Sequence, residues 1–342
     1  MLRQAYRIDK TGSMANLKLV EEEIESPAGQ EVQIKVHAVG LNFADVFAIH
    51  GLYSATPKGS FIPGLEYSGE IVEVGMNVSD FKVGDRVMGV TRFGGYADYI
   101  NIDDRHIVKL QDDWSYEEGA SFLVQGLTAY YALIYLGGLE KDQTVLIHSG
   151  AGGVGIIANR IAKQFNAFTI GTIGSSSKMD VLIREGFDGK IVRGEHFENE
   201  LRSTLAGRDL NIVVETIGGK ILKAGYNVLA PQGRLVVVGA SQFASPGNKP
   251  NYFKLIWKFL TRPKLDPQQM IQENKSIMAF NLIWLYEKVD IMDDMIKEMA
   301  KMDLGKPFVG HTFNFDELHD AIKLFQSGKT TGKVVVKTGH NI

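Results

Sequence analysis

The chain has 342 residues, no cysteine, and 37 basic against 40 acidic side chains. At roughly 150 residues per domain, this length predicts about two domains. The 44% apolar share is that of a globular chain, and the net charge of −3 gives no electrostatic reason to bind nucleic acid. The lack of cysteine excludes disulfides, thiolate nucleophiles, iron–sulfur clusters and cysteine-ligated zinc.

No targeting segment is visible at the start of the chain. The first nine residues lack the apolar stretch of a signal peptide, and no apolar run approaches the ~18–20 residues that span a bilayer. We therefore expect a cytoplasmic protein.

Residues 1–110 have the pattern of strands and turns. Apolar side chains alternate with polar ones over 32–38, which predicts a half-buried strand, and the pattern continues through 71–87 with glycines between the strands. Only 43–49 is predicted to be helical. These features predict a compact, mostly antiparallel β domain.

After residue 113 the pattern changes to alternating helices and strands. Ser115 and Glu118 form a capping-box signature, and 125–136 is predicted to be a buried helix. Continuous β-branched runs alternate with helical segments from 144 to 240, which indicates a parallel sheet covered on both faces. The expected strands are 144–148, 168–173, 212–214 and 235–238, and the expected helices are 154–165, 178–185 and 221–229. The tail returns to mixed structure, with helices at 292–302 and 316–326 and a strand at 333–336.

The strongest motif is a G-x-G-x-x-G match that follows a strand and opens a helix. In a dinucleotide site, Gly150 permits the tight turn, Gly152 lets the backbone approach a pyrophosphate, and Gly155 lets the helix pack on the strand. The helix N-terminus supplies N–H groups and a positive dipole. The alternative is a plain tight turn between strand and helix. The predicted phosphate-binding residues are Gly150, Ala151, Gly152, Gly153, Val154 and Gly155.

The end of the second strand of this unit indicates which dinucleotide is bound. No acidic residue that could bind a ribose 2′-OH appears before Asp180. Instead, hydroxyls and cations gather there, and they suit the 2′-phosphate of NADPH. The alternative is that Ser175 only caps the next helix and Lys178 is solvated. The predicted 2′-phosphate residues are Thr172, Ser175, Ser176, Lys178 and Arg193.

Several motifs, in the right order along the whole chain, resemble those of the medium-chain dehydrogenase/reductase superfamily. The segments 39–45, 51–53, 63–66, 126–130 and 331–334 resemble its zinc-independent quinone oxidoreductase branch. The run 223–229 and the long segment after Gly239 are most similar to the subgroup of synaptic vesicle membrane protein homologues.

The resemblance implies an α/β fold of two domains. A GroES-like, β-rich catalytic domain would comprise 1–123 and 284–342, and a Rossmann doubly wound parallel-sheet domain would comprise 124–283. It also implies a homodimer, formed by pairing the last Rossmann strands edge to edge near 278–283, where an exposed edge favours pairing.

The chain departs from the zinc alcohol dehydrogenases of this superfamily at every ligand position. Those enzymes place a cysteine in the segment that aligns with 41–43, a histidine before the glutamate that aligns with Glu66, and a second cysteine near Val124. Here Leu65 precedes Glu66 and there is no cysteine. A lone glutamate is too few ligands for zinc, so we expect no metal site.

Without a Lewis acid, reduction of a polarised acceptor is easier than alcohol oxidation. The sequence therefore predicts hydride transfer from NADPH to a quinone or an α,β-unsaturated carbonyl, with Tyr53, Asn42 and Thr128 as catalytic candidates. Each has an alternative: Tyr53 as a rim aromatic, Asn42 as a bridge across a turn, and Thr128 as a helix residue bonded to its own backbone. Gly239 and Ser241 are expected near the carboxamide. Lys333 is also placed in the cofactor site, unless it is only a charge at the start of a strand.

The segment 252–265 combines aromatic and basic residues, with Lys254 and Lys258 on one helical face. It is a helix packed over the cleft or the dimer seam, an active-site lid, or an interfacial helix that touches anionic membrane. The last option belongs to the alternative function, an NADPH-binding protein that acts through partner or membrane contact with little catalysis.

Overall fold

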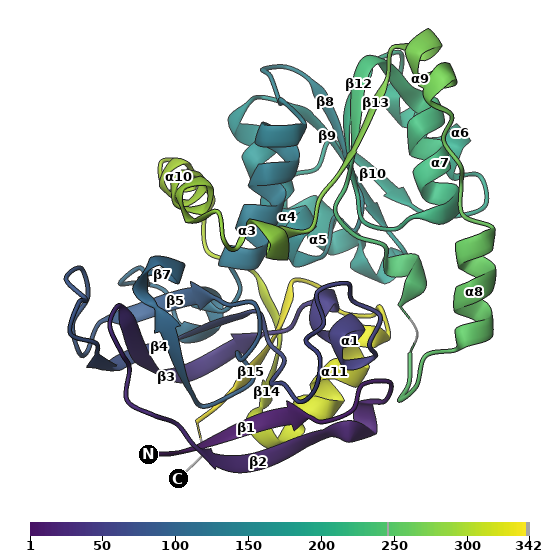
Figure 1. Cartoon of the computed structure of the whole chain (residues 1–342). Coiled ribbons are helices and arrows are strands. Elements are labelled where there is room, and N and C mark those ends of the chain that lie inside the picture. Colours follow the sequence, from purple (N-terminus) through teal and green to yellow (C-terminus); the bar gives the residue numbers. More distant parts are fainter. Residues whose placement is uncertain (245, 340–342) are drawn as a thin grey trace.

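The computed structural model describes residues 1–244 and 246–339 and places them in two lobes (Figure 1). The lower lobe holds both chain ends and is built mainly of strands. The upper lobe comprises a parallel sheet and the helices on its two faces, which confirms the predicted α/β fold class.

A seven-stranded sheet forms the lower lobe, with the order β14-β15-β3-β4-β5-β7 and with β6 also paired to β3. Val32, Ile34 and Val36 of β3 are buried, as its polar–apolar pattern predicts, but Gln33 between them is buried too, where its amide donates to the Glu25 oxygen at 3.0 Å. A separate hairpin of β1 (Leu2–Ile8) and β2 (Leu17–Glu23) lies beside it. The strands are β3 (Glu31–Gly40), β4 (Glu66–Val74), β5 (Arg86–Val90), β6 (Tyr99–Asp103), β7 (Ile107–Lys109), β14 (Val309–Asn314) and β15 (Lys333–Lys337).

The lower core is closed by two helices, α1 (Phe43–Ile49) and α11 (Leu318–Gln326). Phe43 of α1 packs against Phe325 of α11, with ring centroids 4.3 Å apart and the rings tilted by 31°. The N-terminal and C-terminal parts of the chain therefore share one hydrophobic core.

The upper sheet has the order β10-β9-β8-β11-β12-β13, and every pairing in it is parallel. Numbered from its first strand, this is the order 3-2-1-4-5-6 of a dinucleotide-binding fold. The strands are β8 (Thr144–Ile147), β9 (Phe168–Ile173), β10 (Gly189–Val192), β11 (Leu210–Glu215), β12 (Leu229–Val237) and β13 (Ser276–Ala279).

Both faces of this sheet are covered. Val145 and Ile147 of β8 face the core under α3 and α4, whereas Leu146 between them faces the core under α6 and α7. Burial on both faces explains why these strands have continuous apolar runs rather than alternating ones. Of the remaining helices, α2 (Tyr116–Gly119) packs against strands β3 and β4 of the lower lobe. The others are α3 (Leu123–Tyr130), α4 (Gly153–Gln164), α5 (Met179–Arg184), α6 (Phe197–Leu205), α7 (Gly219–Val228), α8 (Tyr252–Leu260), α9 (Pro267–Glu273) and α10 (Val289–Ala300).

The stretch Tyr116–Leu136 is long and apolar enough to cross a membrane by length and composition, with mean hydropathy 1.2. It is not an uninterrupted apolar run: α2 and α3 are separated by a turn, and α3 continues as a π-helical segment, η3 (Tyr131–Leu136). Of its most apolar window, 61% is buried inside the protein, as in the core helix of a globular domain.

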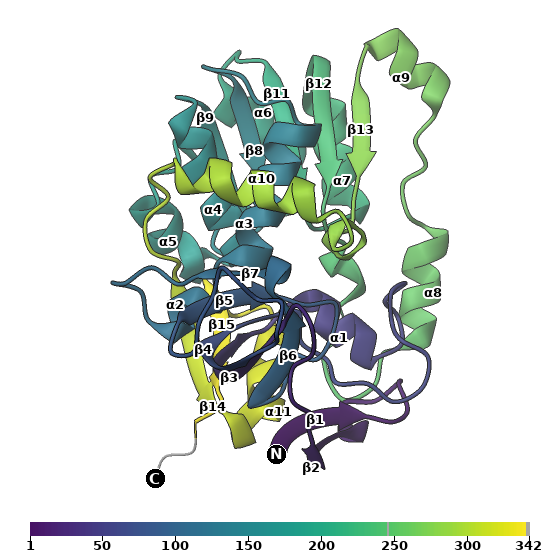
Figure 2. The same cartoon turned by 60° about the vertical axis from the view of Figure 1, so that its left-hand side comes forward.

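The sequence predicts that the chain returns to the catalytic lobe at residue 284. The hydrophobic cores show where the residues after this point pack. Met292, Met295 and Met299 of α10 are buried in the same core as α3 and α4 of the upper lobe (Figure 2). The same core also includes Met88 and Val90 of β5 in the lower lobe, and the separate lower core includes Phe315 with Phe313 packed against it. Helix α10 therefore packs against α3 in a core to which both lobes contribute, and the boundary at 284 stays a prediction.

Candidate active site

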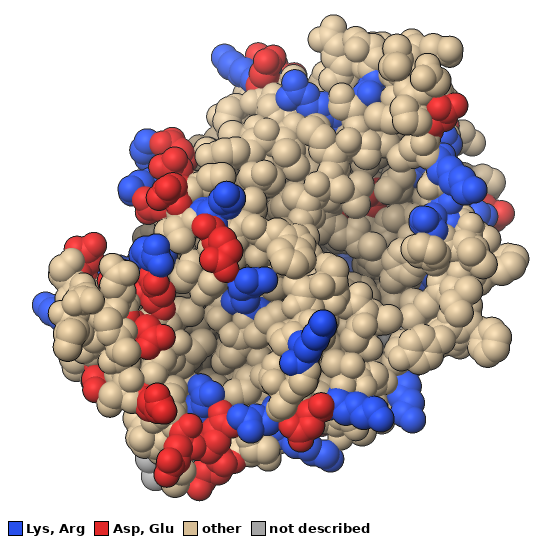
Figure 3. Space-filling view, viewed as in Figure 1, with Lys and Arg blue, Asp and Glu red and all other residues tan. Residues whose placement is uncertain are grey.

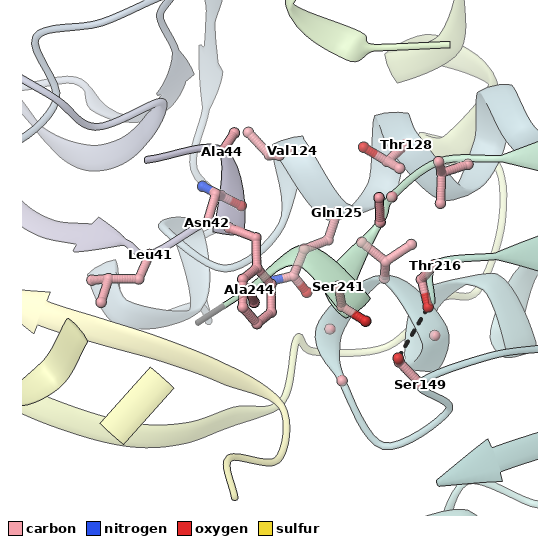
Figure 4. Close-up of a pocket in the computed structure, with 18 of the residues that line it drawn as sticks. Leu41, Asn42, Ala44, Val124, Gln125, Thr128, Ser149, Thr216, Ser241 and Ala244 are labelled. Atoms are coloured by element: carbon pink, nitrogen blue, oxygen red, sulfur yellow. Dashed lines mark hydrogen bonds between the residues drawn. The ribbon is translucent and has the colours of Figure 1, made fainter. Parts of the chain in front are cut away.

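A cavity of about 730 Å³ lies between the lobes and is lined by residues of both. The hollow is visible between the lobes in Figure 3. In Figure 4, Asn42 and Ala44 of the lower lobe lie to the left of Val124, Gln125 and Thr128 of α3, and Ser149 and Thr216, which follow upper-lobe strands, lie on the right.

The predicted glycine turn connects β8 to α4 and opens on this cavity. A Cβ on Gly155 would lie 2.4 Å from the backbone oxygen of Ser149, and one on Gly150 would lie 2.8 Å from Leu182, so the turn needs glycine at both positions. Gly152 meets only the Ser149 oxygen, at 3.3 Å, which leaves its backbone open to the cavity. The N–H groups of the first turn of α4 have no acceptor within the helix. This geometry fits a pyrophosphate.

The strand order of the upper sheet gives a second, independent indication of where a ligand binds. β8 and β11 are neighbours whose following chains leave in opposite directions, which is where doubly wound sheets bind ligands. Ser149 Oγ and Thr216 Oγ1, directly after these two strands, are 3.0 Å apart and both line the cavity (Figure 4).

The predicted 2′-phosphate residues separate into three groups in the structure. Lys178 and Arg193 line the cavity, but Lys178 Nζ donates to the backbone oxygens of Gly328 (2.6 Å) and Thr330 (2.7 Å). Thr172 is fully buried and accepts a hydrogen bond from Arg193 Nη1 at 2.8 Å, so its hydroxyl does not face the cavity. Ser175 and Ser176 are exposed, and Ser175 caps a short 3-10 turn, which is the alternative noted above.

A buried ionic group forms part of the lower wall of the cavity. Lys333 Nζ contacts Glu66 Oε1 and donates to Asn42 Oδ1 at 2.8 Å, and Asn42 Nδ2 donates to Glu66 Oε1 (3.1 Å) and to the Gly40 oxygen (3.2 Å). The side chains of Lys333 and Glu66 are only 4% and 1% exposed. Both amide hydrogens of Asn42 are therefore used inside the protein, as the turn-bridging interpretation requires.

Tyr53 connects the two lobes. Its hydroxyl donates to Asn281 Oδ1 of the upper lobe at 2.7 Å, and both residues line the cavity. Burial raises the pKa of Tyr53 to about 12. The phenol therefore stays protonated at neutral pH and can donate a hydrogen bond there, although it is a weak acid.

The nicotinamide end of the predicted site also lies in the cavity. Thr128, Gly239 and Ser241 all line it. The lining residues that were not predicted include Gln125, Ser149, Thr216 and Asn281. Gln125 lies against the glycine turn, where its Oε1 would be 1.8 Å from a Cβ on Gly153. No motif in the sequence marks these four, because each reaches the cavity only through the packing of α3 and the strand ends.

Comparisons with known proteins agree with this architecture. Residues 28–112 match the alcohol dehydrogenase GroES-like domain, and residues 153–298 match the zinc-binding dehydrogenase domain. The human synaptic vesicle membrane protein VAT-1 homolog is 30% identical over 92% of this chain and 80% of its own length. The zebrafish (Danio rerio) VAT-1 homolog is 32% identical over 90% of this chain, which spans only 64% of that relative.

The chain belongs to the medium-chain dehydrogenase/reductase superfamily. Two solved members superpose over 98% of the chain and 99–100% of their own: mycobacterial Rv1454c complexed with NADPH (TM-score 0.83, 26% identity) and the CurK enoyl reductase (TM-score 0.84, 27% identity). The fold is thus that of a family of oxidoreductases with NADPH complexes among its solved structures.

The zinc in the name of the matched family domain does not fit the residues present. Among residues 1–244 and 246–339, no three His, Asp or Glu side chains are grouped to hold a metal ion. Glu66, which aligns beside a zinc ligand in the superfamily's alcohol dehydrogenases, is paired with the ammonium group of Lys333. The positive charge beside Glu66 in the cleft is therefore the ammonium group of Lys333.

This pairing makes a prediction about stability. Glu66→Gln leaves the buried Lys333 without a carboxylate, and we expect it to lower the free energy of unfolding by about 3–5 kcal/mol. Glu66→Gln combined with Lys333→Met removes both charges and should recover much of that loss. Urea denaturation measures both, with Asp293→Asn in the exposed pair with Lys297 as a control that should change little. A double variant no more stable than the single one would contradict the pairing.

Proposed function

We propose that this chain is an NADPH-dependent reductase that transfers hydride to a quinone or to the C=C bond of an α,β-unsaturated carbonyl, without a metal. The observation that carries the proposal is the composition of the cavity. Its one end holds the glycine turn and the cations Lys178 and Arg193, and its other end is walled mainly by apolar and aromatic side chains. This wall includes Phe43, Phe47, Leu65, Val90, Phe280 and Ile283.

The names of related proteins support both halves of the proposal. The mycobacterial structure was solved with NADPH, and the CurK structure is that of an enoyl reductase. A quinone oxidoreductase-like protein 2 homolog of Nematostella vectensis is 28% identical over 98% of the chain. The apolar wall suits an uncharged, planar acceptor of either class.

NADPH supplies a hydride when it is bound. The first-turn N–H groups of α4 would bind its pyrophosphate, and the backbone around Gly239 and Ser241 would orient its carboxamide. Tyr53, once turned away from Asn281, donates a hydrogen bond to the oxygen on which negative charge develops in the acceptor. With its pKa of about 12, Tyr53 stabilises that oxygen without giving up its proton.

Cofactor choice is tested at Lys178. Lys178→Ala removes a cation from the 2′-phosphate end, so we expect it to weaken NADPH binding about tenfold and NADH binding much less. Since Lys178 also ties the Gly328–Thr330 backbone to the upper lobe, a melting curve should accompany the titrations. Equal weakening of both dinucleotides would show that the 2′-phosphate lies elsewhere.

The reaction is tested by mixing the protein with NADPH and a panel of quinones and enals, and following the loss of reduced-nicotinamide absorbance. We expect turnover on at least one acceptor, and Tyr53→Phe should lower kcat about tenfold by removing one hydrogen-bond donor. Tyr135→Phe, on an exposed ring outside the cavity, is the matched control. Bound NADPH with no turnover on any acceptor would contradict the reductase.

One observation favours a second candidate function, contact with an anionic membrane surface. Helix α8 buries none of its residues, and Phe253, Trp257 and Leu260 on one face are 90%, 69% and 66% exposed. Uncharged residues cover most of this protrusion in Figure 3. Lys254 belongs to the helix, and Arg262 and Lys264 follow it in the sequence, a combination of apolar and basic residues typical of interfacial helices. A helix packed over the cleft, or a closed lid, would bury the stripe within one copy, and within the described chain the stripe is open. Packing at a dimer seam would cover it only in the assembled dimer.

Vesicle sedimentation tests this candidate. The protein should sediment with phosphatidylserine-containing vesicles and less with neutral ones, and Phe253→Ser with Trp257→Ser should abolish the difference because the inserted rings are lost. Met76→Ser, at a 91% exposed position in the lower lobe, is the control. Binding that is unchanged in the double variant would contradict membrane contact, and light scattering would then show whether the stripe joins two copies.

A further inference from the structure

A chain of polar side chains runs across the carboxyl edge of the upper sheet. Glu215 ends β11, His148 follows β8, Thr172 belongs to β9 and Arg193 follows β10, so four adjacent strands supply one residue each. His148 Nδ1 is 2.8 Å from Thr172 Oγ1, Arg193 Nη1 is 2.8 Å from the same oxygen, and His148 Nε2 is 3.3 Å from Glu215 Oε2.

The inner three members of this chain are shut off from solvent. Glu215, His148 and Thr172 are 0% exposed, and only Arg193 reaches the cavity. The other Glu215 oxygen accepts the backbone N–H groups of Ile217 and Gly218, the latter at 2.8 Å. His148 Nε2 and Glu215 Oε2 are buried, have no hydrogen-bond partner among the described residues, and face each other across 3.3 Å.

The donor and acceptor groups of these side chains determine the direction of the hydrogen bonds between them. A guanidinium has only donors, so Arg193 donates to Thr172 and the Thr172 hydroxyl proton is left for His148 Nδ1. His148 then accepts at Nδ1 and carries its proton on Nε2, which faces Glu215. Burial and the charge of Arg193 lower the pKa of His148 to about 3, in keeping with a neutral ring.

Arg193 differs from the other cations of the cavity. Lys333 is paired with Glu66, and Lys178 donates to two backbone oxygens. Within residues 1–244 and 246–339, Arg193 forms no ion pair within 4.0 Å, and its one side-chain hydrogen bond is the bond to Thr172. Most of its donors are therefore available for an anion in the cavity.

We propose that Glu215, His148 and Thr172 are positioning residues which hold the Arg193 guanidinium for the 2′-phosphate of NADPH. This inference rests on the proposed function, from which it takes the cofactor. The three buried residues would affect cofactor selectivity without contacting the cofactor. The Thr172 hydroxyl donates its proton to His148, so a lone pair on the Thr172 oxygen remains free to accept from Arg193 and thereby orients the guanidinium.

The test measures binding rather than turnover. Thr172→Val keeps the shape of the side chain and removes the acceptor of Arg193, so NADPH should bind about five- to twentyfold more weakly while NADH changes less than twofold. Thr172→Ser keeps the hydroxyl and should bind both like the wild type. Thr169→Val, also fully buried on β9 but outside the chain of contacts, is the matched control. Thr172→Ala replaces the valine variant if the latter does not fold.

Fluorescence titration with NADPH and NADH, with a melting curve for each variant, decides the outcome. Arg193→Ala should lose at least as much NADPH affinity as Thr172→Val, and adding Thr172→Val to it should cost nothing more. The positioning role is overturned if Thr172→Val weakens both dinucleotides alike, or still weakens NADPH in the Arg193→Ala background. If Arg193→Ala leaves the NADPH preference intact, the positioning role fails while the reductase stands. A wild type that binds NADPH but reduces no acceptor overturns the reductase alone.

Discussion

The ion pair between Lys333 and Glu66 is the interaction on which the cleft depends. A carboxylate that is 1% exposed needs a cation or several donors, and here it has both, from Lys333, Asn42 and the Val124 N–H group. These partners come from β15, from the start of α1 and from α3. The pair therefore joins the end of the chain to its beginning and to the first helix of the upper lobe, at the wall of the cavity.

The residue before Lys333 extends this joint to the cofactor turn. Gly332 N donates to the Ala151 oxygen at 2.8 Å, and a Cβ on Gly332, which has φ +57°, would lie 2.3 Å from the Phe308 oxygen. Only glycine permits this positive φ together with so close an approach to Phe308, just before β14. The dipeptide Gly332-Lys333 thus contacts both ends of the cavity wall, Ala151 of the glycine turn through Gly332 and Glu66 through Lys333.

Local patterns in the sequence were enough to predict the fold, and much less of the site. Strand–turn–helix context around Gly150–Gly155 predicted β8, the turn and α4, because those features depend on neighbours in the sequence. Glu66 and Lys333 are 267 residues apart, and Tyr53 and Asn281 are 228 apart, so no spacing rule connects them. Thr172 was expected in the phosphate cradle for its hydroxyl, but its side chain points into the sheet edge, towards His148. Which way a hydroxyl at a strand end points is decided by the polar groups on neighbouring strands.

Helix α8, which carries the exposed apolar stripe, is also held in place by polar contacts. A nine-residue helix is marginal alone in water, and an uncovered apolar stripe adds no stability. What fixes α8 are polar ties: Lys258 donates to the Gln242 oxygen, and the preceding segment is held where Met14 N donates to the Asn248 oxygen at 2.8 Å. Gln242 in turn packs against Gly218 and Gly219 and directly follows Ser241 of the cavity wall. A surface that covers the stripe therefore contacts a helix that is hydrogen-bonded to Gln242, one residue away from Ser241 of the cavity wall.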